Sequence, residues 1–106
     1  MRFKQFYEKI FSRSIKSDLT YEEAIEIIDR EKVVIIDVRT PEEYAKRHFK
    51  DAINIPIYEI ERFENLVRNK DELILIYCKS GQRSEMAKQI LLQNGYRNVY
   101  TFDAKI

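Results

Sequence analysis

Two short, uninterrupted apolar runs constrain the fold of this chain more than any other feature of its sequence. They are residues 33–36 (Val-Val-Ile-Ile) and residues 73–77 (Leu-Ile-Leu-Ile-Tyr). Runs of this kind are typical of strands in a parallel sheet that is covered on both faces. Shorter strands are expected at residues 53–55, at residues 99–101 and near Ile15. The chain is therefore expected to form a mainly parallel sheet that lies between helices.

Helical signals alternate with these strands. Two helices are expected to begin with a capping box, in which a threonine caps the helix and a glutamate three residues later reaches back to it. A third segment has apolar residues at helical spacing, and a fourth ends at a glycine that can adopt the left-handed conformation. In chain order, these signals are Thr20 with Glu23, Thr40 with Glu43, residues 59–69, and residues 84–92 with Gly95. The alternation predicts an α/β domain.

Composition excludes several classes of protein. Nineteen basic against eighteen acidic residues give a net charge of +1. This balance gives no indication of nucleic-acid binding, which usually requires an excess of basic residues. No stretch approaches the roughly 20 apolar residues that cross a bilayer, and the N-terminus lacks the apolar core of a secretory signal. A lone cysteine cannot form an internal disulfide, and a free thiol suits the cytoplasm, which is the expected location. One cysteine and one histidine provide no metal-ligand set, so neither a metal nor another cofactor is expected.

Residues 1–14 are expected to stand apart from a domain that spans residues 15–106. Their apolar side chains fall on one helical stripe, with the basic residues mostly off it. The stripe consists of Phe3, Phe6, Tyr7, Ile10 and Phe11. We interpret the segment as an amphipathic helix or extension that packs on this domain or on a copy of it. Contact with a membrane or partner is the weaker interpretation, because so short a segment offers limited area for insertion.

The only cysteine, Cys78, directly follows the second apolar run and precedes a polar turn and a helix. A strand, a tight loop and a helix N-terminus form a cradle for anions, because loop N–H groups point inward and the helix dipole adds positive potential. A thiol at the mouth of such a cradle should be largely thiolate near neutral pH, and therefore nucleophilic. The alternative is a small apolar cysteine at a strand end. The glycine and the two cations that follow Cys78 favour the nucleophile.

Three segments resemble the signatures of single-domain rhodaneses. They are residues 37–56, which begin Asp-Val-Arg-Thr-Pro-Glu-Glu-Tyr; residues 76–84, which contain Cys78; and residues 95–100. Together the resemblance covers about residues 15–103, in the right order and spacing. It implies a rhodanese-like, three-layer α/β fold with a five-stranded, mainly parallel sheet. It also implies a thiosulfate sulfurtransferase that carries sulfur as a cysteine persulfide.

Residue chemistry then suggests a role for each part of the loop. Cys78 is the expected nucleophile, which takes the outer sulfur of a small anionic donor such as thiosulfate and passes it to cyanide, a small thiol or a protein thiol. Five residues are expected to bind the substrate: Lys79, Ser80, Gly81, Gln82 and Arg83. Loop N–H groups would stabilise the persulfide, and Arg83 and Lys79 would hold the charge of the donor. Asp37 and Arg39 are expected to support the loop as a polar network.

Some residues depart from the family pattern. Arg47 and Asp51 stand where the family usually has glycine, so altered turn geometry is expected there. The chain closes with residues 102–106 in place of the Gly-Gly turn and aromatic residue that often end the domain. His48, the only histidine, is interpreted as structural rather than as a general base.

Two other functions compete with sulfur transfer. Protein tyrosine phosphatases and arsenate reductases are one class, and the phosphatases also use a cysteine, a phosphate loop and an arginine, but with one more residue between them than the four between Cys78 and Arg83. The shorter loop favours a single sulfur atom. A non-catalytic rhodanese-fold module for binding or regulation is the other class, and the presence of Cys78 argues against it. A thioredoxin-like oxidoreductase is excluded because there is no Cys-x-x-Cys motif.

Overall fold

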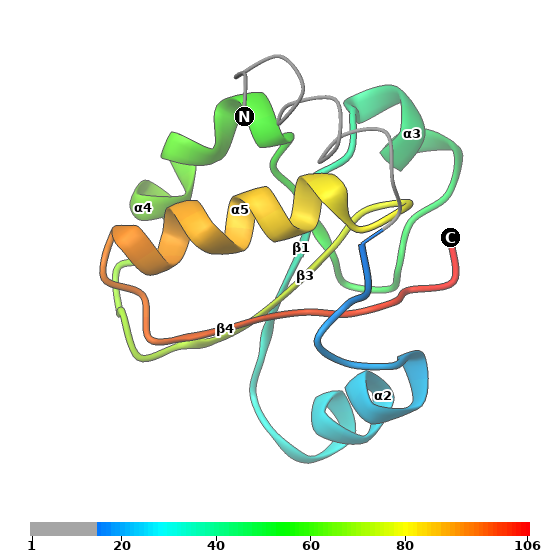
Figure 1. Cartoon of the computed structure of the whole chain (residues 1–106), viewed down its shortest axis with the longest axis horizontal. Helices are drawn as coiled ribbons and strands as arrows, with labels where there is room; N and C mark the ends of the chain where they lie inside the picture. The colour runs from blue at the N-terminus through cyan, green and yellow to red at the C-terminus, as the bar shows by residue number, and fades with distance from the viewer. Residues whose placement is uncertain (1–14) are drawn as a thin grey trace, which may run out of the picture.

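A four-stranded parallel sheet forms the centre of the protein (Figure 1). The computed structural model describes residues 15–106, so the predicted helix or extension at residues 1–14 lies outside the described residues. The strands are β1 (Val34–Asp37), β2 (Ile53–Asn54), β3 (Leu73–Tyr77) and β4 (Asn98–Thr101). Their order in the sheet is β2-β1-β3-β4, and every neighbouring pair is parallel. The predicted α/β class with a parallel sheet is confirmed.

The described sheet has four strands rather than the expected five. In place of a strand near Ile15, a single parallel bridge joins Leu19 to Phe102 beside β4. Its two hydrogen bonds run from the Leu19 N–H to the Thr101 carbonyl (3.0 Å) and from the Asp103 N–H to the Leu19 carbonyl (3.2 Å). The pairing stops there because the next residue, Thr20, already caps a helix.

Both predicted capping boxes are confirmed. Thr20 begins α2 (Tyr21–Arg30) and Thr40 begins α3 (Pro41–Lys46), each with reciprocal bonds between threonine and glutamate. The predicted helix at residues 59–69 is different: a 3-10 segment, η1 (Ile57–Arg62), is followed by the short α4 (Phe63–Leu66). The backbone is already extended at Val67, whose carbonyl accepts a hydrogen bond from the buried Tyr96 hydroxyl. This tertiary contact ends the helix earlier than the apolar spacing predicts.

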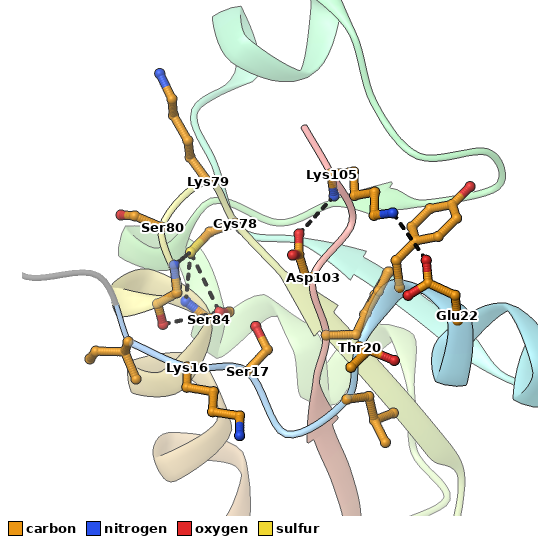
Figure 2. Close-up of a pocket in the computed structure, with 15 residues that line it drawn as sticks. Lys16, Ser17, Thr20, Glu22, Cys78, Lys79, Ser80, Ser84, Asp103 and Lys105 are labelled. Atoms are coloured by element: carbon orange, nitrogen blue, oxygen red, sulfur yellow. Dashed lines mark hydrogen bonds and ion pairs between the residues drawn. The ribbon is translucent and has the colours of Figure 1, made fainter.

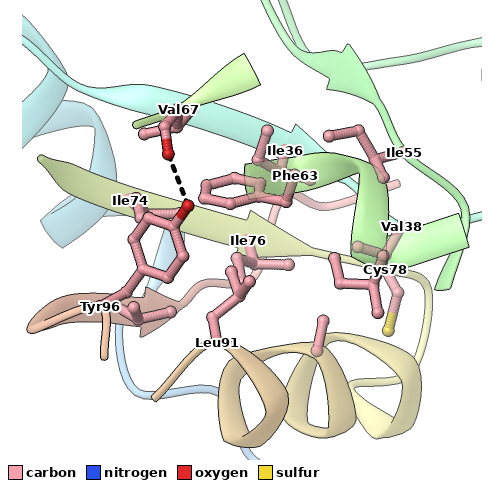
Figure 3. Packing of buried hydrophobic residues seen from close by; sticks show 13 residues of the cluster. Ile36, Val38, Ile55, Phe63, Val67, Ile74, Ile76, Cys78, Leu91 and Tyr96 are labelled. Carbon is pink, nitrogen blue, oxygen red and sulfur yellow. Dashed lines mark hydrogen bonds between the residues drawn. The ribbon is translucent and has the colours of Figure 1, made fainter. Parts of the chain in front are cut away.

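Helices cover both faces of the sheet. The longest described helix, α5 (Gln82–Gln93), lies with α4 on one face, and α2 lies on the other (Figure 1). On the α5 face, Ile36, Ile76 and Phe63 belong to one buried cluster (Figure 3). On the α2 face, Leu75 and other buried residues form a second cluster. None of the helices in the described range has the length and apolar character to span a bilayer.

Two glycines with left-handed backbones bound α5. Gly81 caps its start at φ +93°, and Gly95 follows its end at φ +95°, as predicted for Gly95. They differ in their surroundings. A Cβ atom added at Gly81 would lie 2.1 Å from the Ile15 carbonyl oxygen, whereas a Cβ at Gly95 would meet no atom within 4 Å.

This contrast yields a matched pair of variants. Gly95→Ala should lose about 1 kcal/mol of unfolding free energy, because alanine disfavours a positive φ. Gly81→Ala should lose more, about 2–4 kcal/mol, because the same backbone strain is joined by a clash with backbone atoms of Ile15. Urea unfolding of both variants measures the difference. Equal losses would contradict the close approach of Ile15 to the loop.

Candidate active site

Cys78 is the first residue after β3, at the carboxyl end of the parallel sheet where ligands bind in open α/β folds. Its Sγ accepts hydrogen bonds from the Gly81 N–H (3.1 Å) and the Ser84 N–H (3.4 Å), and the thiol lies 3.4 Å from the Ser84 hydroxyl oxygen. Figure 2 shows these contacts converging on the sulfur. Two backbone dipoles at the start of α5 therefore point at one sulfur atom, an arrangement that stabilises negative charge there.

The cysteine is more buried than the sequence suggested. Cys78 is 6% exposed and belongs to the apolar cluster on the α5 face, although the loop that follows it is exposed at Lys79. The loop folds back over the end of β3, since the N–H groups of Gly81 and Ser84 both reach Sγ. Ser84, in the first turn of α5 as predicted, is fully buried and also donates to the Gly81 carbonyl oxygen (3.1 Å).

The five predicted substrate-binding residues fall into two groups. Lys79, Ser80 and Gly81 line a pocket of about 460 Å³ together with Cys78. Gln82 and Arg83, the first residues of α5, are not among the residues that line it. The opposite walls of this pocket come from the N-terminal segment at residues 15–17 and from the C-terminal residues Asp103 and Lys105 (Figure 2). Sequence reasoning missed the N-terminal wall because residues 15–17 are far from Cys78 along the chain.

Arg83 forms a bidentate ion pair with Glu43, the capping-box glutamate of α3. The two guanidinium nitrogens lie 2.6 and 3.1 Å from the carboxylate oxygens. This contact, aided by hydrogen bonds from Thr40, lowers the pKa of Glu43 from 4.5 to about 2. The pair joins the start of α5 to α3. The positive charge of Arg83, which was expected to bind the anionic donor, is therefore partly balanced by Glu43.

Asp37 and Arg39 form the predicted polar network, and both are buried. The Arg39 guanidinium donates to both Asp37 carboxylate oxygens, with a closest distance of 2.7 Å. The Tyr77 hydroxyl also donates to Asp37 (2.6 Å); burial, together with this contact, raises the pKa of Tyr77. Asp37 pairs in register with Tyr77, and its side chain lies on the face opposite Cys78. The network therefore supports the strand end and makes no direct contact with the sulfur.

The turns that depart from the family pattern take two conformations. Asp51 has φ 66°, the left-handed conformation that glycine adopts freely and aspartate tolerates. Arg47 is extended and needs no glycine; its carbonyl accepts a hydrogen bond from Arg39 (2.6 Å). Between them, His48 stacks on Tyr44 at 3.8 Å and its Nδ1 bonds the Tyr44 carbonyl. These contacts fit the structural interpretation of His48. No group of residues within 15–106 is arranged to hold a metal ion.

The Glu43–Arg83 pair should make stability depend on pH. The folded pKa of Glu43 is lowered to about 2, so its contribution is fully present above about pH 4.5 and is lost as the pH falls towards 2. Glu43→Gln should reduce the unfolding free energy by about 1 kcal/mol at pH 7. The loss is modest because the ion pair is partly exposed and solvent screens it. The difference from the wild type should shrink between pH 5 and pH 2.

The control is Glu59→Gln, which removes a more exposed ion pair with Arg62. That variant should change stability by less than about 0.5 kcal/mol. Thermal melts across the pH range compare the two variants. A deficit for Glu43→Gln that persists unchanged at pH 2 would contradict the ion pair as its cause.

Comparisons with known proteins agree with this architecture. Residues 20–104 match the family model of the rhodanese-like domain. The thiosulfate sulfurtransferase PspE of Escherichia coli is 45% identical over 65 residues, which are 60% of this chain and 62% of PspE, so the match spans less than two thirds of that relative. A sulfurtransferase of Allochromatium vinosum is 38% identical over 74 residues, covering 69% of this chain and 67% of the relative.

A solved structure described as a rhodanese with anions from Escherichia coli has a TM-score of 0.62 and 40% identity, covering 69% of this chain and 85% of that one. The match to the family model covers all four described strands and the whole Cys78 loop. The chain therefore belongs to the rhodanese-like domain family.

Proposed function

We propose that this protein is a sulfurtransferase that carries sulfane sulfur as a persulfide on Cys78. The observation that carries the proposal is the pair of N–H groups, from Gly81 and Ser84, that converge on Sγ. Relatives named as sulfurtransferases support sulfur transfer as the reaction class. Thiosulfate is proposed as a donor because PspE is named for it. The cytoplasm is the proposed location, because a lone reactive thiol suits a reducing compartment.

The proposed reaction proceeds in two displacements. The Cys78 thiolate attacks the outer sulfur of thiosulfate, the S–S bond of the donor breaks, and sulfite leaves with the bonding electrons. The product is Cys78–S–S⁻. An acceptor nucleophile then attacks the outer sulfur, and Cys78 leaves as a thiolate. The Cys78 thiolate that attacks in the first step and leaves in the second is stabilised by fixed backbone dipoles directed at Sγ, so no general base is required.

A phosphatase is disfavoured by the size and charge of the loop. A transferring phosphoryl group needs donors around three oxygens, whereas two N–H groups here converge on a single sulfur. Arg83, the only residue of the loop able to form a bidentate contact with phosphate, is already engaged by Glu43. Both features support sulfur over phosphate as the transferred group.

Intact mass after incubation with thiosulfate tests the persulfide. The wild type should gain one sulfur atom for each chain, and Cys78→Ser should gain none, because Cys78 is the only cysteine. The serine variant should remain folded with a loss of about 1 kcal/mol, because its hydroxyl can accept the same loop N–H groups. Thiosulfate:cyanide turnover that survives in the folded variant would refute Cys78 as the nucleophile. A folded wild type that never gains sulfur would favour a non-catalytic module.

Activity on an aryl phosphate tests the loop-size argument. Wild-type turnover of the phosphate should lie at least about two orders of magnitude below turnover of thiosulfate, because misplaced donors cost about that much. Cys78→Ser controls for contaminating phosphatases. Cysteine-dependent phosphate hydrolysis that matches sulfur transfer would reverse the ranking of the two functions.

A further inference from the structure

Four apolar side chains form an exposed strip on the outer side of η1, α4 and α5. Tyr58 of η1 is 64% exposed and Leu66 of α4 is 54% exposed. On α5, Met86 and Ile90 lie one turn apart on the same face and are half-buried. The η1 segment contacts both α4 and α5, and α4 lies with α5 on this side of the sheet (Figure 1). These four residues are therefore neighbouring parts of one outer strip.

The charges of this surface are incompletely balanced. Together, η1 and α4 contain three glutamates and one arginine. Both basic residues of α5 are already paired, with Glu43 and with Asp18. Among the described residues, Glu85 of α5 has a buried carboxylate oxygen, Oε2, that accepts no hydrogen bond. Because a buried carboxylate oxygen without a partner is costly, this surface is suited to receive a cation.

The sequence of residues 1–14 has the complementary features. Its apolar side chains, at positions 3, 6, 7, 10 and 11, fall on one helical stripe. The segment also carries four basic residues and one acidic residue, so its charge is opposite to that of η1 and α4. An apolar stripe flanked by cations matches an apolar strip flanked by carboxylates in both respects.

The length of this segment and the point where it joins the domain fit the same surface. The Ile15 N–H donates to the Ser80 carbonyl (2.9 Å), and the Ile15 carbonyl lies against Gly81 at the start of α5. A helix of residues 2–12 would be about 16 Å long, and the twelve residues of α5 span about 18 Å. A helix that starts beside Gly81 and runs along α5 therefore reaches the level of Ile90.

We propose that residues 1–14 dock as a helix on the outer strip of their own chain, with Arg13 paired to Glu85. Arg13 lies two residues before Ile15, and the Glu85 N–H donates to the Gly81 carbonyl (3.0 Å). Both residues are thus within about one helical turn of the contact between Ile15 and Gly81, and the guanidinium can donate to Oε2. The tether raises the effective concentration of the segment to about the millimolar range, which favours its own domain over a second copy or a membrane.

Docking of this kind would act on the Cys78 loop through Ile15. Asp18 already anchors the chain after Ile15 to α5, through Lys88 (2.8 Å). A docked helix would anchor the chain before Ile15, so that Ile15 is held from both sides against Gly81. The docking is independent of the reaction proposed for Cys78, and either can fail alone.

A spin label locates the segment in the full-length chain. The label is attached to Gln5→Cys, which lies off the apolar stripe, in a Cys78→Ser background that has no other thiol. Amide signals of η1 and of residues 86–90 should be broadened, and those of α2, on the opposite face of the sheet, should not (Figure 1). Spin-labelled chains mixed with isotope-labelled chains that carry no spin label should show no broadening.

Acidic substitutions test the apolar stripe. Ile10→Asp should lower the midpoint of thermal unfolding by about 4 °C or more, because an aspartate on the stripe cannot pack on the outer strip. Gln5→Asp is the matched control in the same segment and should lower the midpoint by less than about 1 °C. In Ile10→Asp, hydrogen exchange at the Ile15 amide should be about tenfold faster, because its anchor is lost.

Charge reversal tests the ion pair. Arg13→Glu and Glu85→Arg should each lower the midpoint by about 2 °C or more, and the double variant should recover about half of the combined loss. Arg13→Glu combined with Glu31→Arg is the control, because Glu31 is an exposed glutamate at the end of α2. That combination should recover none of the loss.

The other occupants and positions give different results. Absence of broadening on η1 and α5 would overturn the proposal. Broadening in the mixed sample would show docking on a second copy. Binding to vesicles of anionic phospholipid, with no broadening in their absence, would assign the segment to a membrane surface. Equal midpoints for Ile10→Asp and Gln5→Asp would refute packing through the apolar stripe, and equal recovery with Glu85→Arg and Glu31→Arg would refute the ion pair.

Discussion

The buried ion pair between Asp37 and Arg39 holds the end of the sheet on which the candidate active site is built. Burying two charges costs several kcal/mol for each ion unless other groups replace the lost water. Here the Tyr77 hydroxyl and the Arg39 backbone N–H donate further hydrogen bonds to the Asp37 carboxylate. The Arg47 carbonyl accepts a hydrogen bond from the Arg39 guanidinium. Because Tyr77 immediately precedes Cys78, the same bonds that satisfy the pair also fix where β3 ends and where the loop begins.

Two further ion pairs tie the elements around the loop together. Glu43 with Arg83 joins α3 to the start of α5, and Asp18 with Lys88 joins the N-terminal segment to the middle of α5. The backbone N–H groups of Gly81 and Ser84 contact Sγ directly, and the fold sets their direction. Such dipoles are effective in a recess from which most water is excluded, because the local dielectric is low.

Local signals in the sequence were sufficient for most of the fold. The two capping boxes, the apolar runs that form β1 and β3, and the left-handed Gly95 depend on residues close together in the chain, and each was predicted. The polar network of Asp37 and Arg39 was also anticipated, because the two residues are adjacent to one strand end. Contacts between distant segments were not: Glu43 with Arg83 spans 40 positions, and neither residue type reveals its partner. The burial of Cys78 and the wall at residues 15–17 depend on the same kind of long-range packing.

Gly81 links the chemistry of the loop to the long-range packing around it. Its left-handed backbone starts α5 and directs its N–H at Sγ, while the absence of a Cβ admits the Ile15 carbonyl. The same residue thus contributes to the anion cradle and brings the opposite wall of the pocket against the loop. A longer loop would separate these two contacts, since the helix N-terminus would move away from the strand end. The short spacing between Cys78 and Arg83 therefore allows the loop to do two things at once. It directs N–H groups at a single sulfur atom, and it keeps the loop in contact with the wall of the pocket.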